Sequence, residues 1–135
     1  MASYPIAEMA IAPFHASKLK AAGIRTTTKL LQRAATPRLR KQLAESTSIP
    51  MQLILDWANA ADLTRVRGVA LDYAELLVAV GVTTVKDLGR RNAANLVARM
   101  VEVNSKRRLV ELLPSEARVA RWIESAKSLA PGMEY

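Results

Sequence analysis

The chain has 135 residues, half of them apolar, which is enough to bury a substantial core and excludes a disordered chain. It contains no cysteine, so disulfides, thiolate nucleophiles and cysteine metal sites are excluded. The net charge of +8 favours polyanions such as nucleic acid or anionic lipid headgroups, and a basic protein with a different kind of partner remains an equal alternative. Without a bilayer-spanning apolar run or a signal-peptide pattern, we expect a cytoplasmic protein that does not bind membranes.

Residues 10–63 and 68–128 indicate two copies of one helical unit. In the first half of each copy the matching residues stand 58 positions apart, and Ala16, Leu19, Gly23, Ile24 and Leu30 recur as Ala74, Leu77, Gly81, Val82 and Leu88. In the second half the spacing is 65, and Ile54, Trp57, Ala58 and Ala61 recur as Val119, Trp122, Ile123 and Ala126. Because only apolar and turn positions repeat, the duplication describes architecture and not an active site.

Apolar residues recur at helical spacing in both copies, so we expect helices throughout. Gly23 and Gly81 are predicted to end helices in the left-handed conformation of a Schellman motif. Side-chain caps are predicted to begin five later helices, at Thr26, Thr36, Thr84, Asn92 and Ser115. Asp87 is expected to close a capping box with Thr84.

Three further expectations concern the rest of the chain. Residues 105–113 should add one or two helical turns before Pro114. The two ends, residues 1–5 and 130–135, are rich in turn formers and should fray. Trp57 and Trp122 lie on matching apolar stripes, which favours core anchors over rings that stack on a ligand.

Residues 63–88 resemble a helix-hairpin-helix unit of the kind found in DNA polymerases, ligases and repair nucleases. The residues that carry the resemblance are Val66, Gly68-Val69-Ala70, Ala74, Leu77, Gly81 and Val82. The whole chain also resembles a bacterial family known only as domain of unknown function 4332, whose members pair two such units with a following tryptophan helix. The resemblance implies an all-α fold of two tandem helix-hairpin-helix-like repeats, each followed by helices that close over a tryptophan. The units would span residues 1–63 and 64–135 of one compact body.

In DNA-binding members of that superfamily, hairpin N–H groups approach a phosphate at the start of a helix. By position, the resemblance implies contacts from the amides of Gly68, Val69 and Ala70. Basic side chains could add charge nearby, namely Arg65, Arg67, Lys86, Arg90 and Arg91. Ala70 stands where the family usually has glycine, so a purely structural turn is an equal alternative. The first copy has Ala10, Ile11 and Ala12 at these positions, which favours a structural turn there.

The densest basic run is Lys106, Arg107 and Arg108, and it has two interpretations. It is either a solvated helix face or a second contact with phosphate or an acidic partner, and short charge runs favour the first. A sequence-reading helix is not evident, and only 4% of the residues are aromatic, which disfavours single-strand binding.

The residues that could suggest catalysis are few. His15 is the only histidine, and it has no neighbouring ligand at metal spacing. Asp72 and Glu75 stand at helical spacing, where carboxylates usually face solvent or pair with a base. We therefore expect no enzyme, no cofactor, no metal and no small-molecule substrate.

Two functions remain open from the sequence. The first is sequence-independent binding of a nucleic-acid backbone, most plausibly duplex, through the second hairpin. The alternative is a module for protein interaction or self-association whose hairpins have lost the phosphate contact. Net charge and Gly68 favour the first, and the degenerate first hairpin favours the second.

Overall fold

The computed structural model describes residues 3–135, and these residues are helical without a β-strand. The helices are α1 (Pro13–Ala21), α2 (Thr27–Ala34), α3 (Pro37–Thr47), α4 (Met51–Leu63), α5 (Leu71–Ala79), α6 (Val85–Gly89), α7 (Ala93–Arg107) and α8 (Glu116–Lys127), preceded by the short 3-10 helix η1 (Ile6–Glu8). The prediction of an all-α fold is confirmed. None of the helices within residues 3–135 is both long and apolar enough to cross a membrane.

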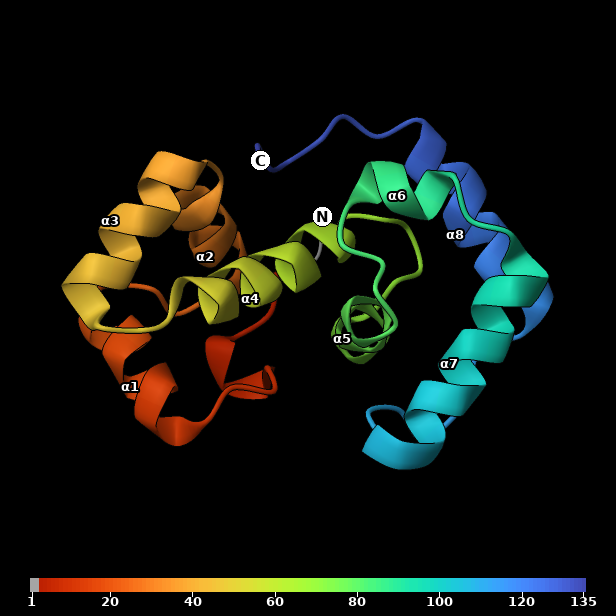
Figure 1. The fold of residues 1–135 in the computed structure, drawn as a ribbon, viewed down its shortest axis with the longest axis horizontal. Helices are drawn as coiled ribbons and strands as arrows, with labels where there is room; N and C mark the ends of the chain where they lie inside the picture. The colour runs from red at the N-terminus through yellow and green to blue at the C-terminus, as the bar shows by residue number, and fades with distance from the viewer. Residues whose placement is uncertain (1–2) are drawn as a thin grey trace.

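Three of the four helix pairs begin at the spacing of the sequence pattern, and α3 and α7, which begin 56 residues apart, are the exception. Helices α1 and α5 both have nine residues, and α2 and α6 begin at Thr27 and Val85, 58 residues apart. Helices α4 and α8 begin at Met51 and Glu116, 65 residues apart. We call α1–α4 the first series of helices and α5–α8 the second series. In each series the second helix packs on the fourth, α2 on α4 and α6 on α8, while α4 also packs on α5 (Figure 1). The internal duplication is our interpretation of this correspondence, and the domain boundaries stay a prediction.

The predicted glycine stops are confirmed in both places. Gly23 and Gly81 have φ angles of +85° and +98°, and each follows the last residues of a helix. Ile24 N–H donates to Leu19 O at 2.9 Å, and Val82 N–H donates to Leu77 O at the same distance. These four apolar residues are fully buried, so each turn is fixed by hydrogen bonds and by the core together: Leu19, Ile24, Leu77 and Val82.

All five predicted caps accept a backbone N–H three residues on, and they are Thr26, Thr36, Thr84, Asn92 and Ser115. The capping box was wrong in detail, because Asp87 accepts from Thr83 N–H at 3.4 Å and not from Thr84. The prediction for residues 105–113 was also wrong beyond Arg107, where α7 ends. Asn104 exchanges two hydrogen bonds with the Val110 backbone, which satisfy that backbone outside a helix.

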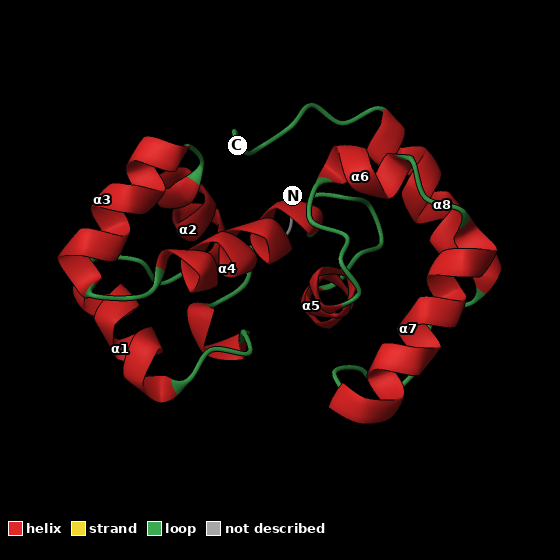
Figure 2. Ribbon diagram, in the orientation of Figure 1, coloured by secondary structure: helices red, strands yellow, loops and turns green. Residues whose placement is uncertain are grey.

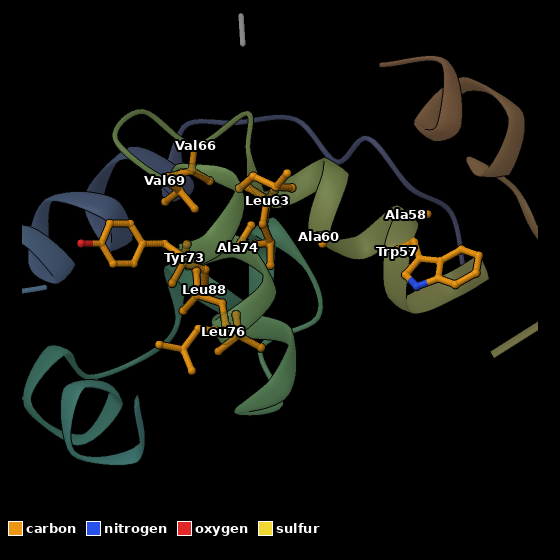
Figure 3. Packing of buried hydrophobic residues seen from close by; sticks show 14 of the residues in the cluster. Trp57, Ala58, Ala60, Leu63, Val66, Val69, Tyr73, Ala74, Leu76 and Leu88 are labelled. Carbon is orange, nitrogen blue, oxygen red and sulfur yellow. The ribbon is translucent and has the colours of Figure 1, made fainter. Parts of the chain in front are cut away.

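Each series of helices contains a closely packed pair of aromatic rings. His15 lies 5.7 Å from Trp57 between ring centroids, and Tyr73 lies 5.2 Å from Trp122. His15 and Tyr73 stand 58 residues apart, and both tryptophans are buried, at 8% and 1% exposure. Figure 3 shows Trp57 on α4 at one end of the apolar cluster and Tyr73, Val66 and Val69 at the other. Burial agrees with core anchors, although closure of each unit by its tryptophan stays an interpretation.

The expectation of frayed ends was wrong for the described residues, and residues 1–2 lie outside them. Near the start, Thr27 N–H donates to Tyr4 O at 2.8 Å, Tyr4 N–H donates to Thr27 Oγ1 at 3.0 Å, and Ile6 N–H donates to Arg25 O at 2.8 Å. The segment is ordered because it pairs with the turn before α2, where an isolated β-bridge joins Pro5 to Thr26. Short polar sequences fray only when they find no such partner.

The C-terminal segment, residues 130–135, crosses from α8 back to α2 and α3, as the loop view in Figure 2 shows. Glu134 N–H donates to Ala35 O at 2.7 Å, and the buried Arg40 guanidinium donates to Glu134 O at 2.7 Å. The Tyr135 hydroxyl donates to Asn59, and burial followed by the nearby Asp62 charge raises the pKa of Tyr135 to about 12. A turn-rich sequence thus becomes an ordered strap.

Asp62 fixes the middle of this strap. Its carboxylate accepts from Arg65 at 2.7 Å and from Gly132 N–H, and Arg65 also donates to Ala130 O at 2.8 Å. Burial raises the pKa of Asp62 above its usual value, and the bonds from Arg65 and Gly132 act against that shift. A Cβ on residue 132 would collide with Asp62 Oδ1.

We expect Trp57→Ala and Trp122→Ala each to lower the free energy of unfolding by about 3–5 kcal/mol, because each removes a large buried ring. Urea unfolding followed by circular dichroism measures the change. Phe14 is 66% exposed, so Phe14→Ala should stay within about 0.5 kcal/mol of the parent. A near-neutral effect of either tryptophan substitution would contradict its role in the core.

Gly132→Ala should destabilise the protein by about 1–3 kcal/mol, because the added methyl group displaces the strap from Asp62. Glu134→Gln is the matched control, since only the backbone of Glu134 makes the contacts described for it. Thermal unfolding of both variants checks this, and equal midpoints would show that the strap contributes little.

Candidate anion-binding site

The second hairpin, residues 64–70, joins α4 to α5, and two buried valines anchor its turn. Val69 N–H donates to Val66 O at 3.0 Å, and both side chains point into the core (Figure 3). Arg67 and Gly68 lie between them and are exposed. Alternation of buried and exposed residues in this turn therefore presents one guanidinium and one glycine backbone to solvent.

The backbone N–H groups of the hairpin differ in availability. Those of Gly68 and Ala70 have no hydrogen-bond acceptor within residues 3–135, whereas that of Val69 is taken by Val66. Of the three candidate amides, that of Val69 is therefore already used to close the turn. Ala70 precedes α5 without a side-chain cap, and among the first amides of that helix the Tyr73 N–H is taken by Asp72.

Residue 68 must be glycine for two reasons. Its φ angle is +87°, a conformation that L side chains rarely adopt. A Cβ there would also lie 3.2 Å from Trp122 Nε1, inside normal contact distance. Substitution of Gly68 would thus disturb the fold and any ligand contact together, so removal of nearby charges is a cleaner test of binding.

In the first hairpin, the backbone N–H at the position that matches Gly68 has an acceptor within the protein. Ala10, 58 residues before Gly68, donates its N–H to Glu75 Oε2 of α5 at 2.6 Å. Burial raises the pKa of Glu75 above its usual value, the Ala10 bond opposes this, and the Asp72 charge adds to it. The first hairpin therefore holds an internal carboxylate, in agreement with its expected structural role.

A cavity of about 660 Å³ lies between the second hairpin and α8. Its charged and donor groups come from both elements, and the lining includes Arg67, Gly68, Arg118, Arg121, Trp122 and Glu124. A second cavity of about 380 Å³ is lined by the hairpin and Tyr4. Because Arg67 and Gly68 line both cavities, they form a ridge between two hollows.

Arg118 and Arg121 are the residues that sequence reasoning missed. They stand three residues apart on α8 and therefore share a face of that helix. The Arg118 guanidinium lies 5.2 Å from the centre of the Tyr73 ring, which holds it beside α5. Their spacing was visible in the sequence, but the packing of this face against the hairpin was not.

The basic residues predicted for the site do not all gather there. Arg65 is bound to Asp62, and Arg91 is bound to Asp87 at 3.0 Å and to Gly81 O at 3.1 Å. The Asp87 hydrogen bond raises the pKa of Arg91, so this guanidinium is held in its own ion pair. Of the five arginines and lysines proposed around the hairpin, Arg67 alone lines the cavity beside α8.

The remaining predicted side chains are exposed on other elements. Lys86 lies on α6 and Arg90 directly follows it. Lys106 and Arg107 end α7, and Arg108 follows in the left-handed conformation with a φ angle of +49°. Arg107 lines a separate cavity with Trp57 and Glu75, so this basic run faces a different part of the molecule from Gly68.

Other polar groups do not form a recognised reactive set. His15 Nδ1 is buried beside Trp57 and has no partner within residues 3–135. Asp72 accepts the N–H of Tyr73 at 2.8 Å, at the start of α5. Among the described residues, no group of three His, Cys, Asp or Glu side chains could hold a metal ion.

Comparison with known proteins gives one match. A family model described as "Domain of unknown function (DUF4332)" matches residues 9–129, nearly the whole chain. No curated protein and no solved structure matches the chain.

Glu75→Gln tests how the negative charge of Glu75, whose carboxylate binds the first hairpin, affects stability. The variant keeps an oxygen for Ala10 N–H but removes a charge that burial disfavours. Because the pKa of Glu75 is raised above 4.5 in the folded protein, the folded state binds more protons than the unfolded chain just above that pH, and stability falls as pH rises.

We therefore expect Glu75→Gln to gain stability relative to the parent as pH rises through this window, and to keep a constant difference above it. Urea unfolding of both proteins on either side of pH 4.5 measures this. Parallel pH curves would show that the Glu75 charge is not penalised.

Proposed function

The chain belongs to the DUF4332 family, and since that description states no activity, we propose from its own residues that the protein binds nucleic-acid backbone without catalysis. The contact would be made by the second hairpin and would not depend on base sequence. Duplex is the form that the residues favour, because rings for stacking on single strands are scarce and the tryptophans are buried.

One observation carries the proposal, and it is the difference between the two hairpins. In the first, the N–H of Ala10 binds the carboxylate of Glu75. In the second, the matching N–H of Gly68 has no acceptor within residues 3–135. The same donor position is thus filled by an internal anion in one copy and left for an external anion in the other.

The charge around Gly68 supports a phosphate as that anion. Arg67 lies next to it on the hairpin, and Arg118 and Arg121 face it from α8. Arginine matches phosphate oxygens in a planar, two-bond geometry and remains charged at any physiological pH. Contacts to phosphate fix position on a strand without reading its bases, which agrees with the lack of a base-reading helix.

Protein interaction or self-association is the second candidate, and exposed apolar side chains favour it. Leu112 is 79% exposed and Val101 is 47% exposed, next to α8 and on α7. Asp72 also places a negative charge at the start of α5, which weakens attraction of a phosphate to that helix. In this case the hairpin would be a structural turn only.

Fluorescence anisotropy with a labelled duplex tests the first candidate. We expect binding to weaken steeply as salt rises, because each neutralised phosphate releases bound counterions. Arg67→Gln should weaken binding and lower the magnitude of the salt slope by about 1. Arg38→Gln is the matched control, since it removes the same charge from an exposed site on α3.

The results separate the two candidates. Absence of binding at low salt, or an equal loss for Arg67→Gln and Arg38→Gln, would contradict backbone binding at the hairpin. A stable oligomer in light scattering that is lost in Leu112→Ser would favour self-association instead.

A further inference from the structure

We infer that the cavity between the second hairpin and α8 receives the terminal phosphate of a nucleic-acid strand. The inference rests on the proposed function and specifies it, because it distinguishes a strand end from a continuous backbone. The ridge of Arg67 and Gly68 would contact the backbone, and the hollow beside it would take the end.

The charge of the cavity matches a phosphate monoester. Arg67, Arg118 and Arg121 supply three positive charges, and Glu124 supplies one negative charge. A terminal phosphate carries about −1.5 to −2 at pH 7, whereas a phosphate within a strand carries one negative charge. Three guanidiniums around one hollow therefore balance a strand end better than a single internal phosphate.

The shape of the site points the same way. A volume of about 660 Å³ gives room for a group that enters the protein. The backbone of an uninterrupted duplex is convex and rests on a ridge, so it would leave this hollow unfilled. The aliphatic stems of the arginines offer an apolar wall to the attached sugar and base.

Trp122 supplies an independent observation. Its side chain is 1% exposed, and its Nε1–H has no acceptor within residues 3–135. Its Nε1 lies 3.2 Å from the position that a Cβ of residue 68 would take, and Gly68 and Trp122 line the same cavity. A buried donor without a partner is costly, so an oxygen of a bound phosphate ester next to Gly68 would stabilise the site.

Arg118 is held in place before a ligand arrives. Arg118 rests over the Tyr73 ring, and its backbone N–H donates to Ser115 at the start of α8. The Tyr73 hydroxyl donates to Leu112 O at 2.9 Å, which fixes the ring that supports Arg118. Less side-chain freedom is therefore lost on binding than for an unsupported arginine.

Three duplexes of one sequence test the inference by anisotropy at a single salt concentration. The first has 5′-phosphate ends, the second has 5′-hydroxyl ends, and the third is closed by hairpin loops at both ends. We expect the phosphorylated duplex to bind on the order of tenfold more tightly than the other two. Arg118→Gln and Arg121→Gln should remove this preference, and Arg38→Gln should keep it.

The outcomes separate this inference from the proposed function. Equal affinity for all three duplexes would overturn the end-binding site and leave backbone binding intact. Absence of binding to any duplex would overturn both. Adenosine monophosphate binding as tightly as the phosphorylated duplex would replace the strand end with a free nucleotide.

NMR of the two indole N–H groups gives a second readout. On titration with the phosphorylated duplex, we expect the Trp122 signal to move and the Trp57 signal to stay, because only Trp122 lines the cavity beside α8. A Trp122 signal that does not move while the duplex binds would place the terminal phosphate elsewhere.

Discussion

The close contact between Gly68 and Trp122 is the constraint on which the site depends. A left-handed glycine lets the hairpin backbone lie against the indole edge, and this brings α8 beside the turn. The contact sets Arg67 next to Arg118 and Arg121, although about fifty residues of sequence separate the turn from α8. It also leaves two N–H groups, from Gly68 and Trp122, without acceptors in the described chain. The packing of α8 on the hairpin therefore also produces the arrangement of N–H donors and arginines that we propose as the anion site.

The two hairpins differ in what their matching backbone N–H groups contact. Glu75 lies on α5 of the second series but binds the N–H of Ala10 in the first. The first hairpin thereby makes a contact between the two series of helices. The second has no such carboxylate, and arginines take its place around the turn. The helices that carry the two hairpins are alike in length, since α1 and α5 both have nine residues.

Local chemistry made much of the fold predictable. Gly23 and Gly81 stop helices, and Thr26 and Thr36 begin them, because each signal acts within a few residues of sequence. The site was less predictable, because it depends on contacts between distant elements. Arg65 was expected to face a ligand, but the buried Asp62 three residues before it takes its charge.

Long-range contacts also explain the other failures. The C-terminal segment looked like a frayed end because nothing in its sequence reveals Arg40 as its partner. Arg118 and Arg121 were overlooked because their charge acquires meaning only where α8 meets the hairpin. Helix ends could thus be read from neighbouring residues, whereas tertiary partners required the structure.

The strap of residues 130–135 has a consequence for how the chain folds. Its bond from Arg40 to Glu134 joins groups 94 residues apart and thus closes nearly the whole chain into one loop. Such distant pairing raises contact order, which is associated with slower folding than in a helical bundle with local contacts. Without the strap, Arg40 would keep its bond to Ala34 O and Asp62 its bond from Arg65, but Arg40 would lose Glu134 O and Asp62 would lose Gly132 N–H. Each buried charge would thus be less well paired than in the intact chain.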